Sequence, residues 1–461
     1  MTFKGGDQQF GSFFKDVPEK TNSKSNIAAL DGVRAIAALA VLTFHLNILN
    51  GGPPWNMGKY PLISAVATFG GSGVTLFFIL SGFLLFMPYA RALLFEGDWP
   101  STRDFYLRRA LRIIPGYYAA LFLIIVLFHP EYLHADHWQQ VLLFVTFLMD
   151  TSKQTFMQLN GPFWTLAIEW QFYMLLPFIA LGFSLIVRRL SSLPQRRLII
   201  LLTCCLAVIA WGLFIRYVGI HYKAYPTATV LVPRSVLNIT LLFVYGMGGK
   251  YLESFAVGMI ICTCYVFARH PACGASLLAG LRRISPWLWG CGLLILLFTA
   301  GWHFNVLHWH GWPFAYLDPI TPVFEWLNEM VIAIGYGACI VAILFDTGGL
   351  KFLFERRLLR WIGLISYGLY MWHLPLLDFF QSHILPVFPH MSPLITYVLT
   401  WLWVVVFIIP VAFCSYALIE EPWMRLRHKL RKQQKPHAEV SPAVQVPEKQ
   451  EASESVQTSP L

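Results

Sequence analysis

Charged residues are scarce in this sequence. Aspartate, glutamate, lysine and arginine make up 13% of its residues and 57% are hydrophobic, whereas soluble proteins average roughly 25% charged residues. So low a charged fraction excludes an ordinary soluble domain and indicates a polytopic membrane protein. The formal net charge of +10 does not indicate a nucleic-acid partner, because the basic residues lie mainly in short loops between apolar runs. There they set the orientation and meet anionic membrane lipid or phosphates.

Several other signals are missing as well. Eight cysteines are present, but most lie within apolar runs as small buried hydrophobes, and no cysteine–histidine set has zinc-finger spacing. Neither a structural disulfide nor a metal site is expected. The polar N-terminus lacks the pattern of a cleavable signal. No internal repeat is found, which weakens the case for an inverted-repeat transporter.

Long apolar runs are what the sequence has in abundance. Each is near the ~20 residues that a bilayer requires, which predicts an all-α, polytopic bundle of about ten spans. The runs are 29–50, 64–88, 110–128, 162–187, 198–219, 250–268, 285–304, 325–345, 359–380 and 393–419. Two shorter apolar pieces, 140–149 and 236–247, are predicted to be interfacial or re-entrant.

Loop charge orients this bundle. Arginine and lysine concentrate in alternate loops, and the loops 305–324 and 381–392 carry neither. The positive-inside rule then places both termini in the cytoplasm. Three regions are expected: a flexible N-terminal tail at 1–25, a transmembrane domain at 26–424, and a basic, then disordered cytoplasmic tail at 425–461.

Three ionisable residues lie in the first span, namely Asp31, Arg34 and His45. Arg34 and His45 are separated by about three helical turns, or roughly 16 Å, so both side chains point the same way. An ionisable side chain inside a span costs at least ~2.5 kcal/mol unless it meets a partner or a water-filled cavity. We therefore expect this face to line a functional cavity. The alternative is that Asp31 and Arg34 pair at the headgroups while His45 bonds a neighbouring helix.

Arginines also gather where the third span begins. Arg112 lies four residues after Arg108 and three after Arg109, so on a helix these arginines form a cationic face at the predicted cytoplasmic mouth. The helix continues to Tyr117, well inside the apolar run. Guanidinium groups bind phosphate bidentately. Together with Arg34, these residues are candidates for holding a phosphorylated donor. The alternative is that they only anchor the span to anionic headgroups.

A carboxylate, Glu169, lies about two turns from the outer end of the fourth span, with Thr165 and Tyr173 one turn to either side. On the predicted topology, His45 lies at a comparable depth. A carboxylate that orients an imidazole is the usual second member of a general-base pair, so His45 and Glu169 are the candidate catalytic residues. The alternative for Glu169 is a structural hydrogen bond between helices.

Two further segments carry small or polar residues. Ser81 and Gly82 in the second span are of the size that lets helices pack closely or lets a slim ligand pass between them. Near the end of the chain, Ser366, Tyr370 and His373 fall roughly on one helix face. Aromatic-belt anchoring explains Tyr370 without any chemistry, and His373 is either a structural histidine or part of an acceptor site.

Taken together and in this order, the motifs resemble the membrane-bound acyltransferase 3 family, whose members O-acylate sugars and other acceptors of cell envelopes. The resemblance runs from Leu30 to about Trp423. The motifs are Leu30-Asp31-Gly32-Val33-Arg34 with His45, the Arg108/Arg109/Arg112/Pro115 string, Trp164-Thr165-Leu166 with Glu169 and Phe172-Tyr173, and Ser366-Tyr367 with Tyr370 and Trp372-His373.

The resemblance implies a ten-span bundle with a cytoplasmic acyl-CoA donor, an essential histidine in the first span and arginines near the inner mouth. Carried over, the catalytic residues are His45 and Glu169. The donor-binding residues are Arg34, Arg108, Arg109, Arg112 and Tyr117. The supporting residues are Asp31, Ser81, Trp164, Tyr173, Tyr370 and His373.

This sequence departs from the family pattern in three ways. Trp170 follows Glu169 where the family often has a second acid, and Thr165 replaces the commoner serine. Some members carry a fused extracytoplasmic esterase-like domain, and none is expected in this protein. The acceptor is therefore expected to be reached in the membrane domain itself or by a separate partner.

The function expected from the sequence is transfer of an acyl group, with acetyl favoured, from acyl-CoA to a hydroxyl of a carbohydrate or glycolipid acceptor. The enzyme would lie in a bacterial plasma (inner) membrane and hold no permanently bound cofactor. The rival class is a proton-coupled transporter in which His45, Glu169 and Arg34 form a relay. A third possibility is a membrane scaffold whose polar groups are merely paired.

Overall fold

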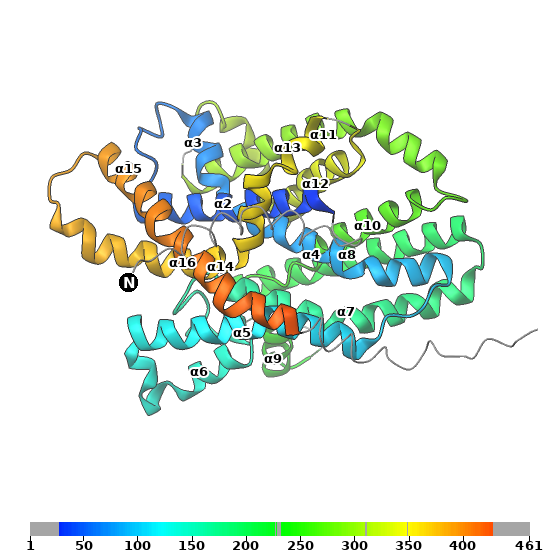
Figure 1. The fold of residues 1–461 in the computed structure, drawn as a ribbon, viewed down its shortest axis with the longest axis horizontal. Helices are drawn as coiled ribbons and strands as arrows, with labels where there is room; N and C mark the ends of the chain where they lie inside the picture. Colours follow the sequence, from blue (N-terminus) through cyan, green and yellow to red (C-terminus); the bar gives the residue numbers. More distant parts are fainter. Residues whose placement is uncertain (1–26, 226, 228–231, 309–310, 348, 427–461) are drawn as a thin grey trace, which may run out of the picture.

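The computed structural model describes residues 27–225, 227, 232–308, 311–347 and 349–426. Every regular element in these ranges is a helix, which confirms the predicted all-α fold (Figure 1). The predicted N-terminal tail lies outside the described residues, as does the predicted C-terminal tail beyond residue 426.

The helices follow the predicted apolar runs closely. In chain order the α-helices are α2 (Ala28–Leu49), α3 (Pro61–Thr68), α4 (Gly73–Phe95), α5 (Thr102–Phe128), α6 (Trp138–Val145), α7 (Phe163–Leu190), α8 (Pro194–Ala224), α9 (Arg234–Val244), α10 (Leu252–Ala268), α11 (Ala275–Leu307), α12 (Phe324–Phe345), α13 (Gly349–Phe354), α14 (Arg357–Phe379), α15 (Pro393–Trp403) and α16 (Ile409–Ser415). A 3-10 turn, η1 (Phe69–Ser72), joins α3 to α4, and π-helical turns before and after α16 continue the last long helix to Glu420.

Eight helices among the described residues are long and apolar enough to cross a membrane. They correspond to eight of the ten predicted spans. The other two predicted spans are α10, which has 17 residues, and α14, which has 23 residues but includes Arg357, Arg360 and Asp378. The structure therefore supports a polytopic helical membrane protein, and the count of ten crossings stays a prediction.

The two short apolar pieces also form helices. They are α6 with 8 residues and α9 with 11 residues. At 1.5 Å per residue these helices reach only about 12 and 16 Å, well below the ~30 Å of a hydrocarbon core. Neither helix is long enough to cross, in keeping with the interfacial or re-entrant placement expected from the sequence.

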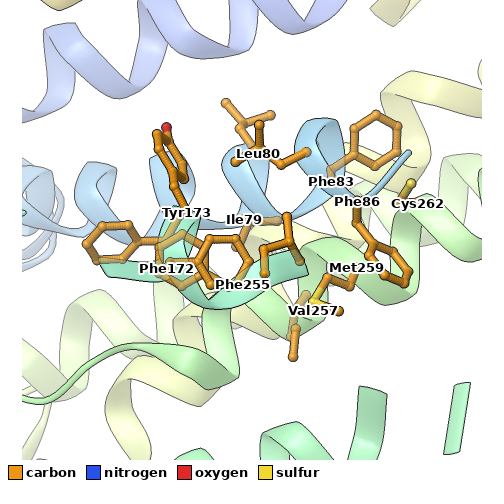
Figure 2. Close-up of a cluster of buried hydrophobic side chains, with 14 of the residues drawn as sticks. Ile79, Leu80, Phe83, Phe86, Phe172, Tyr173, Phe255, Val257, Met259 and Cys262 are labelled. Carbon is orange, nitrogen blue, oxygen red and sulfur yellow. The ribbon is translucent and has the colours of Figure 1, made fainter. Parts of the chain in front are cut away.

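Helices α4, α7 and α10 meet in a cluster of buried hydrophobic side chains (Figure 2). Phe172 of α7 stacks on Phe255 of α10 with ring centroids 3.9 Å apart. Glycines allow α4 and α10 to approach at this crossing, because a Cβ at Gly82 would overlap the carbonyl group of Phe255, and a Cβ at Gly258 would overlap that of Ile79. Close helix packing, one of the two roles expected for the small residues of the second span, is thus confirmed at Gly82.

Helices α2 and α14 run side by side in the same direction. Gly363 near the start of α14 packs against the carbonyl group of Asp31 near the start of α2, and His373 meets His45 toward the other end of the same two helices. We call the end of the bundle with Asp31 the arginine end, because Arg109 and Arg112 at the start of α5 line the same cavity as Arg34. The opposite end, with His45 and His373, is called the histidine end. A parallel arrangement is what the predicted topology requires for its first and ninth spans.

Candidate active site

A cavity opens among α2, α4, α5, α7 and α14, with a volume of about 780 Å³ including its open mouth. Its lining mixes apolar residues, most of them from α4, with polar groups contributed by all five helices. The polar and charged lining residues are Arg34, Ser81, Arg109, Arg112, Thr165, Glu169, Tyr173, Ser366, Tyr367 and Tyr370. Residues far apart in the chain thus converge on one space, and they include most of the site residues predicted from the sequence.

Three arginines give the cavity a cationic wall. Helix α5 begins where the Ser101 hydroxyl accepts a hydrogen bond from the Asp104 backbone N–H, and the helical spacing that follows turns Arg109 and Arg112 to one face. Arg34 of α2 donates a hydrogen bond to Asp31 at 3.1 Å. No hydrogen bond or ion pair joins Arg112 to another described residue, so its guanidinium group is available to a ligand.

Glu169 is the acidic group in this lining. Its Oε1 atom accepts hydrogen bonds from the Ser81 hydroxyl of α4 and from the Tyr173 hydroxyl one turn away. Glu169 also interacts electrostatically with Arg34. The carboxylate therefore ties α4 to α7 and offsets part of the arginine charge. No hydrogen bond or ion pair joins Glu169 to His45, so the predicted general-base pair of these two residues is not formed.

Tyr370 lies where the cavity approaches the histidine end. Its hydroxyl shares a hydrogen bond of 2.6 Å with Thr165, and its ring packs edge-on against Phe77, with centroids 5.8 Å apart. The centroid of the Tyr370 ring also lies 5.8 Å from that of His373. Tyr370 therefore belongs to the lining of the arginine-lined cavity and also lies beside His373.

His45 contacts another histidine. The His373 Nε2 atom is 3.0 Å from His45 Nδ1, and the two ring centroids are 5.0 Å apart. His45 Nδ1 also lies 3.0 Å from the carbonyl oxygen of Val41. His373 is buried, whereas His45 is partly exposed. The described residues contain no group of three or more side chains arranged to hold a metal ion.

Six predicted site residues do not line the cavity. Asp31 contacts Arg34, and His45 and His373 contact each other, whereas the other three lie apart from these groups. The Tyr117 hydroxyl donates to the carbonyl oxygen of Phe144 at 2.9 Å, and its side chain is fully buried, so the predicted donor-binding role is not supported by this geometry. Arg108 interacts electrostatically with Tyr89 and does not line the cavity. Trp164 does not line the cavity either, and its ring packs on that of Tyr251.

A buried ion pair that was not predicted from the sequence joins α8 to α10. Arg216 donates to Glu253 through Nε at 2.9 Å and Nη2 at 2.5 Å, and its guanidinium group lies 4.8 Å from the centre of the Tyr251 ring. A signal was available, because Arg216 and Glu253 are opposite charges within two consecutive apolar runs. Such charges need partners inside a membrane protein.

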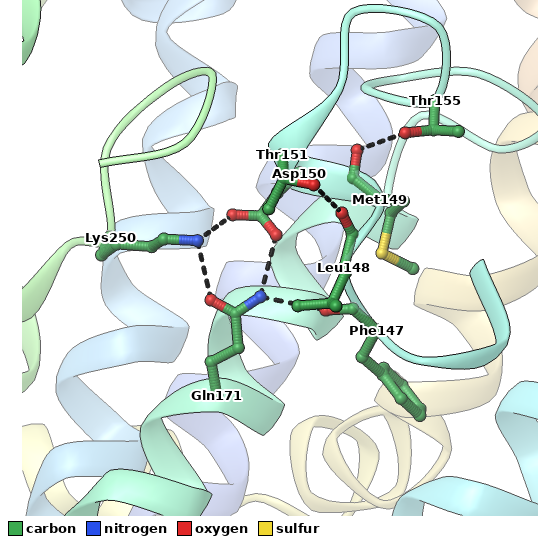
Figure 3. Close-up of polar contacts among 8 residues, drawn as sticks. All are labelled: Phe147, Leu148, Met149, Asp150, Thr151, Thr155, Gln171 and Lys250. Atoms are coloured by element: carbon green, nitrogen blue, oxygen red, sulfur yellow. Dashed lines mark hydrogen bonds and ion pairs between the residues drawn. The ribbon is translucent and has the colours of Figure 1, made fainter. Parts of the chain in front are cut away.

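A second missed network joins loops at the histidine end to α7 (Figure 3). Lys250 forms an ion pair with Asp150 and donates a hydrogen bond of 2.8 Å to Gln171 Oε1. Gln171 in turn donates to Asp150 at 2.8 Å and to the carbonyl oxygen of Phe147 at 2.9 Å. These bonds fix the segment that precedes α7 and hold the start of the helix that carries Thr165 and Glu169.

Fold and site together define a helical membrane protein with an arginine-lined cavity beside a histidine pair. Residues 27–420 match the family described as "Acyltransferase domain". The chain belongs to this family, which is the one that its sequence motifs resemble.

Two relatives show how this chain compares with known proteins. The peptidoglycan O-acetyltransferase OatA of Listeria monocytogenes is 25% identical over 374 residues, which cover 77% of this chain and 50% of the Listeria protein. The O-acetyltransferase OatA of Staphylococcus aureus is 25% identical over 343 residues, which cover 60% of this chain and 52% of that protein. The chain thus spans about half the length of these curated relatives. No solved structure matches the chain. The apolar helices and the bacterial relatives identify it as a bacterial multi-pass membrane protein.

Proposed function

We propose that the protein transfers an acetyl or other short acyl group from cytoplasmic acyl-CoA to a hydroxyl of a carbohydrate acceptor in the cell envelope. The observation that carries the proposal is a cavity with arginines toward one end and, beyond Tyr370, a histidine pair toward the other. Peptidoglycan is the acceptor class that the name of the Listeria relative suggests.

The arginine wall suits the donor. Nucleotide phosphates carry several negative charges, and guanidinium groups bind them through charge-assisted hydrogen bonds. Arg34, Arg109 and Arg112 would hold the phosphates, and Glu169 would keep this cluster in place through Ser81 and Tyr173. The thioester would then extend along α2 toward His45, over roughly 16 Å of helix rise.

The histidine suits the chemistry. Neutral His45 would accept the proton of the acceptor hydroxyl while the hydroxyl oxygen bonds to the thioester carbonyl carbon. The carbon–sulfur bond then breaks, and the leaving thiolate takes the proton from His45. In an alternative route, the imidazole is acylated first and passes the group to the acceptor. An acyl-histidine trapped with labelled donor, in the absence of acceptor, would distinguish the second route from the first.

Purified protein in lipid bilayers tests the proposal. Labelled acetyl-CoA should be converted to free thiol together with an acetylated peptidoglycan-derived oligosaccharide. His45→Ala should abolish this transfer, whereas His134→Ala, a change in an exposed loop, should leave it intact. Transfer that persists in His45→Ala would refute the role of His45. Solute or proton flux without any transfer would support the transporter class instead.

A further inference from the structure

The arrangement of hydrogen-bonding atoms around the histidine pair restricts where its protons lie. His373 Nδ1 is 3.0 Å from the carbonyl oxygen of Leu369. A carbonyl oxygen can only accept a hydrogen bond, so His373 Nδ1 must carry the proton in this contact. In a neutral imidazole, the other nitrogen, Nε2, then has a free lone pair.

That lone pair is directed at His45. His373 Nε2 is 3.0 Å from His45 Nδ1, so His45 Nδ1 must supply the proton between the two rings. The carbonyl oxygen of Val41, 3.0 Å from the same atom, also demands a proton on Nδ1. Both contacts therefore favour one tautomer, in which Nδ1 of His45 carries the hydrogen and its Nε2 is left unprotonated.

A protonated Nδ1 leaves His45 Nε2 as the basic atom. This is the tautomer that a general base needs, because the reacting nitrogen must hold a lone pair. When Nε2 takes a proton, the ring becomes positively charged and its Nδ1–H becomes a stronger donor. A lone pair already aimed at Nδ1 stabilises that cation without rearrangement, as the aspartate does in a serine–histidine–aspartate triad.

We propose that His373 is the positioning residue for His45: its Nε2 lone pair orients the His45 ring and stabilises the imidazolium that forms during acyl transfer. This rests on the proposed function only in taking His45 as the base. A buried histidine thus takes the role that the sequence predicted for Glu169. The carbonyl of Val41 also engages the His45 backbone N–H within α2, whereas the His373 lone pair is directed at the ring alone.

The hydrogen bond itself can be measured apart from activity. In bilayer samples with 15N-labelled histidine, the His45 signals are identified by their loss in His45→Gln. We expect His45 Nδ1 to be protonated, its Nε2 to be unprotonated, and a 15N–15N coupling across the hydrogen bond to His373 Nε2. A protonated Nε2 on His45, or the absence of this coupling, would overturn the assignment.

A matched pair of variants tests its role in catalysis. His373→Gln places an amide oxygen near the position of Nε2 and keeps an acceptor for His45, whereas His373→Leu has a similar size but no acceptor. His373→Leu should lower kcat by about 10²-fold or more with little change in KM for the donor, since a general base contributes 10²- to 10⁴-fold. His373→Gln should recover at least about tenfold of that loss.

The outcomes separate this inference from the proposed function. Both variants should show the same thermal unfolding profile in detergent, so a lower kcat in the leucine variant is not a folding defect. If the leucine variant unfolds at a lower temperature, its kcat is set aside. The role of His373 is then tested by the kcat of the glutamine variant and by the 15N measurement on wild-type protein. If His45→Ala is inactive but His373→Leu stays within about threefold of wild type, or if Gln and Leu variants lose equally, the role of His373 is refuted. Transfer that survives in His45→Ala refutes His45 as the base and this inference with it, whereas the absence of any transfer by the wild-type protein refutes the proposed function.

Discussion

Arg112→Gln is the most direct test of donor recognition. Arg112 lines the cavity, and no hydrogen bond or ion pair joins it to another described residue. Its electrostatic neighbours include Arg34, which repels it, and the buried carboxylate Glu420, which attracts it. Removing its charge therefore leaves no described residue without a hydrogen-bond partner. The substitution should weaken donor binding and leave the stability of the fold unchanged.

The magnitude follows from the type of bond. A hydrogen bond to a charged group is worth about 1.5–3 kcal/mol, and each 1.4 kcal/mol is a factor of ten in affinity. We therefore expect KM for acetyl-CoA to rise by about 10- to 150-fold. Acetyl-pantetheine lacks the nucleotide phosphates, so its use as a donor should change by less than about threefold.

The assay is release of free thiol by purified protein at varied concentrations of each donor. Arg103→Gln is the matched control, because Arg103 is an exposed arginine in the first turn of the same helix and does not line the cavity. It should leave both KM values unchanged. An equal loss with both donors in Arg112→Gln would contradict phosphate recognition and would point to damage of the whole site.

Two further predictions concern the framework of the site. Gly82→Ala should lower the free energy of unfolding by about 1–3 kcal/mol, because the new methyl group overlaps Phe255, whereas Gly182→Ala, where a Cβ meets no described atom within 4 Å, should be neutral or slightly stabilising. Arg216→Met should cost about 3–5 kcal/mol by leaving Glu253 buried and unpaired, and adding Glu253→Leu should restore much of the loss. Thermal unfolding in detergent checks both, and equal stability of the two glycine variants, or of wild type and Arg216→Met, would contradict them.

Composition and apolar run length were enough to predict the helical class and the positions of the long helices. The bilayer imposes a minimum length on each crossing and a high cost on isolated charge, so both features are visible in the linear sequence. For the same reason, Arg34, Arg109, Arg112 and Glu169 could be selected as candidate site residues. Each is an ionisable group within or beside an apolar run, and all four line the cavity.

Which of these groups contact one another depended on tertiary structure. Glu169 and His45 are predicted at similar depths, yet depth does not determine the rotation of a helix or its neighbours. Packing of α2 against α14 at Gly363 brings His373 to His45, while α7 turns Glu169 toward Ser81 of α4. A side chain's position along a helix follows from the sequence. Its partner follows from the crossing of helices that are far apart in the chain.

The sequence by itself therefore determined a polytopic helical protein with a polar stripe along its first span, because the cost of burying charge in lipid is local to each residue. The tertiary structure decided that the two ends of this stripe contact different groups. Arg34 joins the arginines of α5 around a cavity, and His45 joins a second histidine on α14. Those contacts arise from close packing between helices, where a single Cβ at a crossing would force the helices apart, and no periodicity within one helix encodes them.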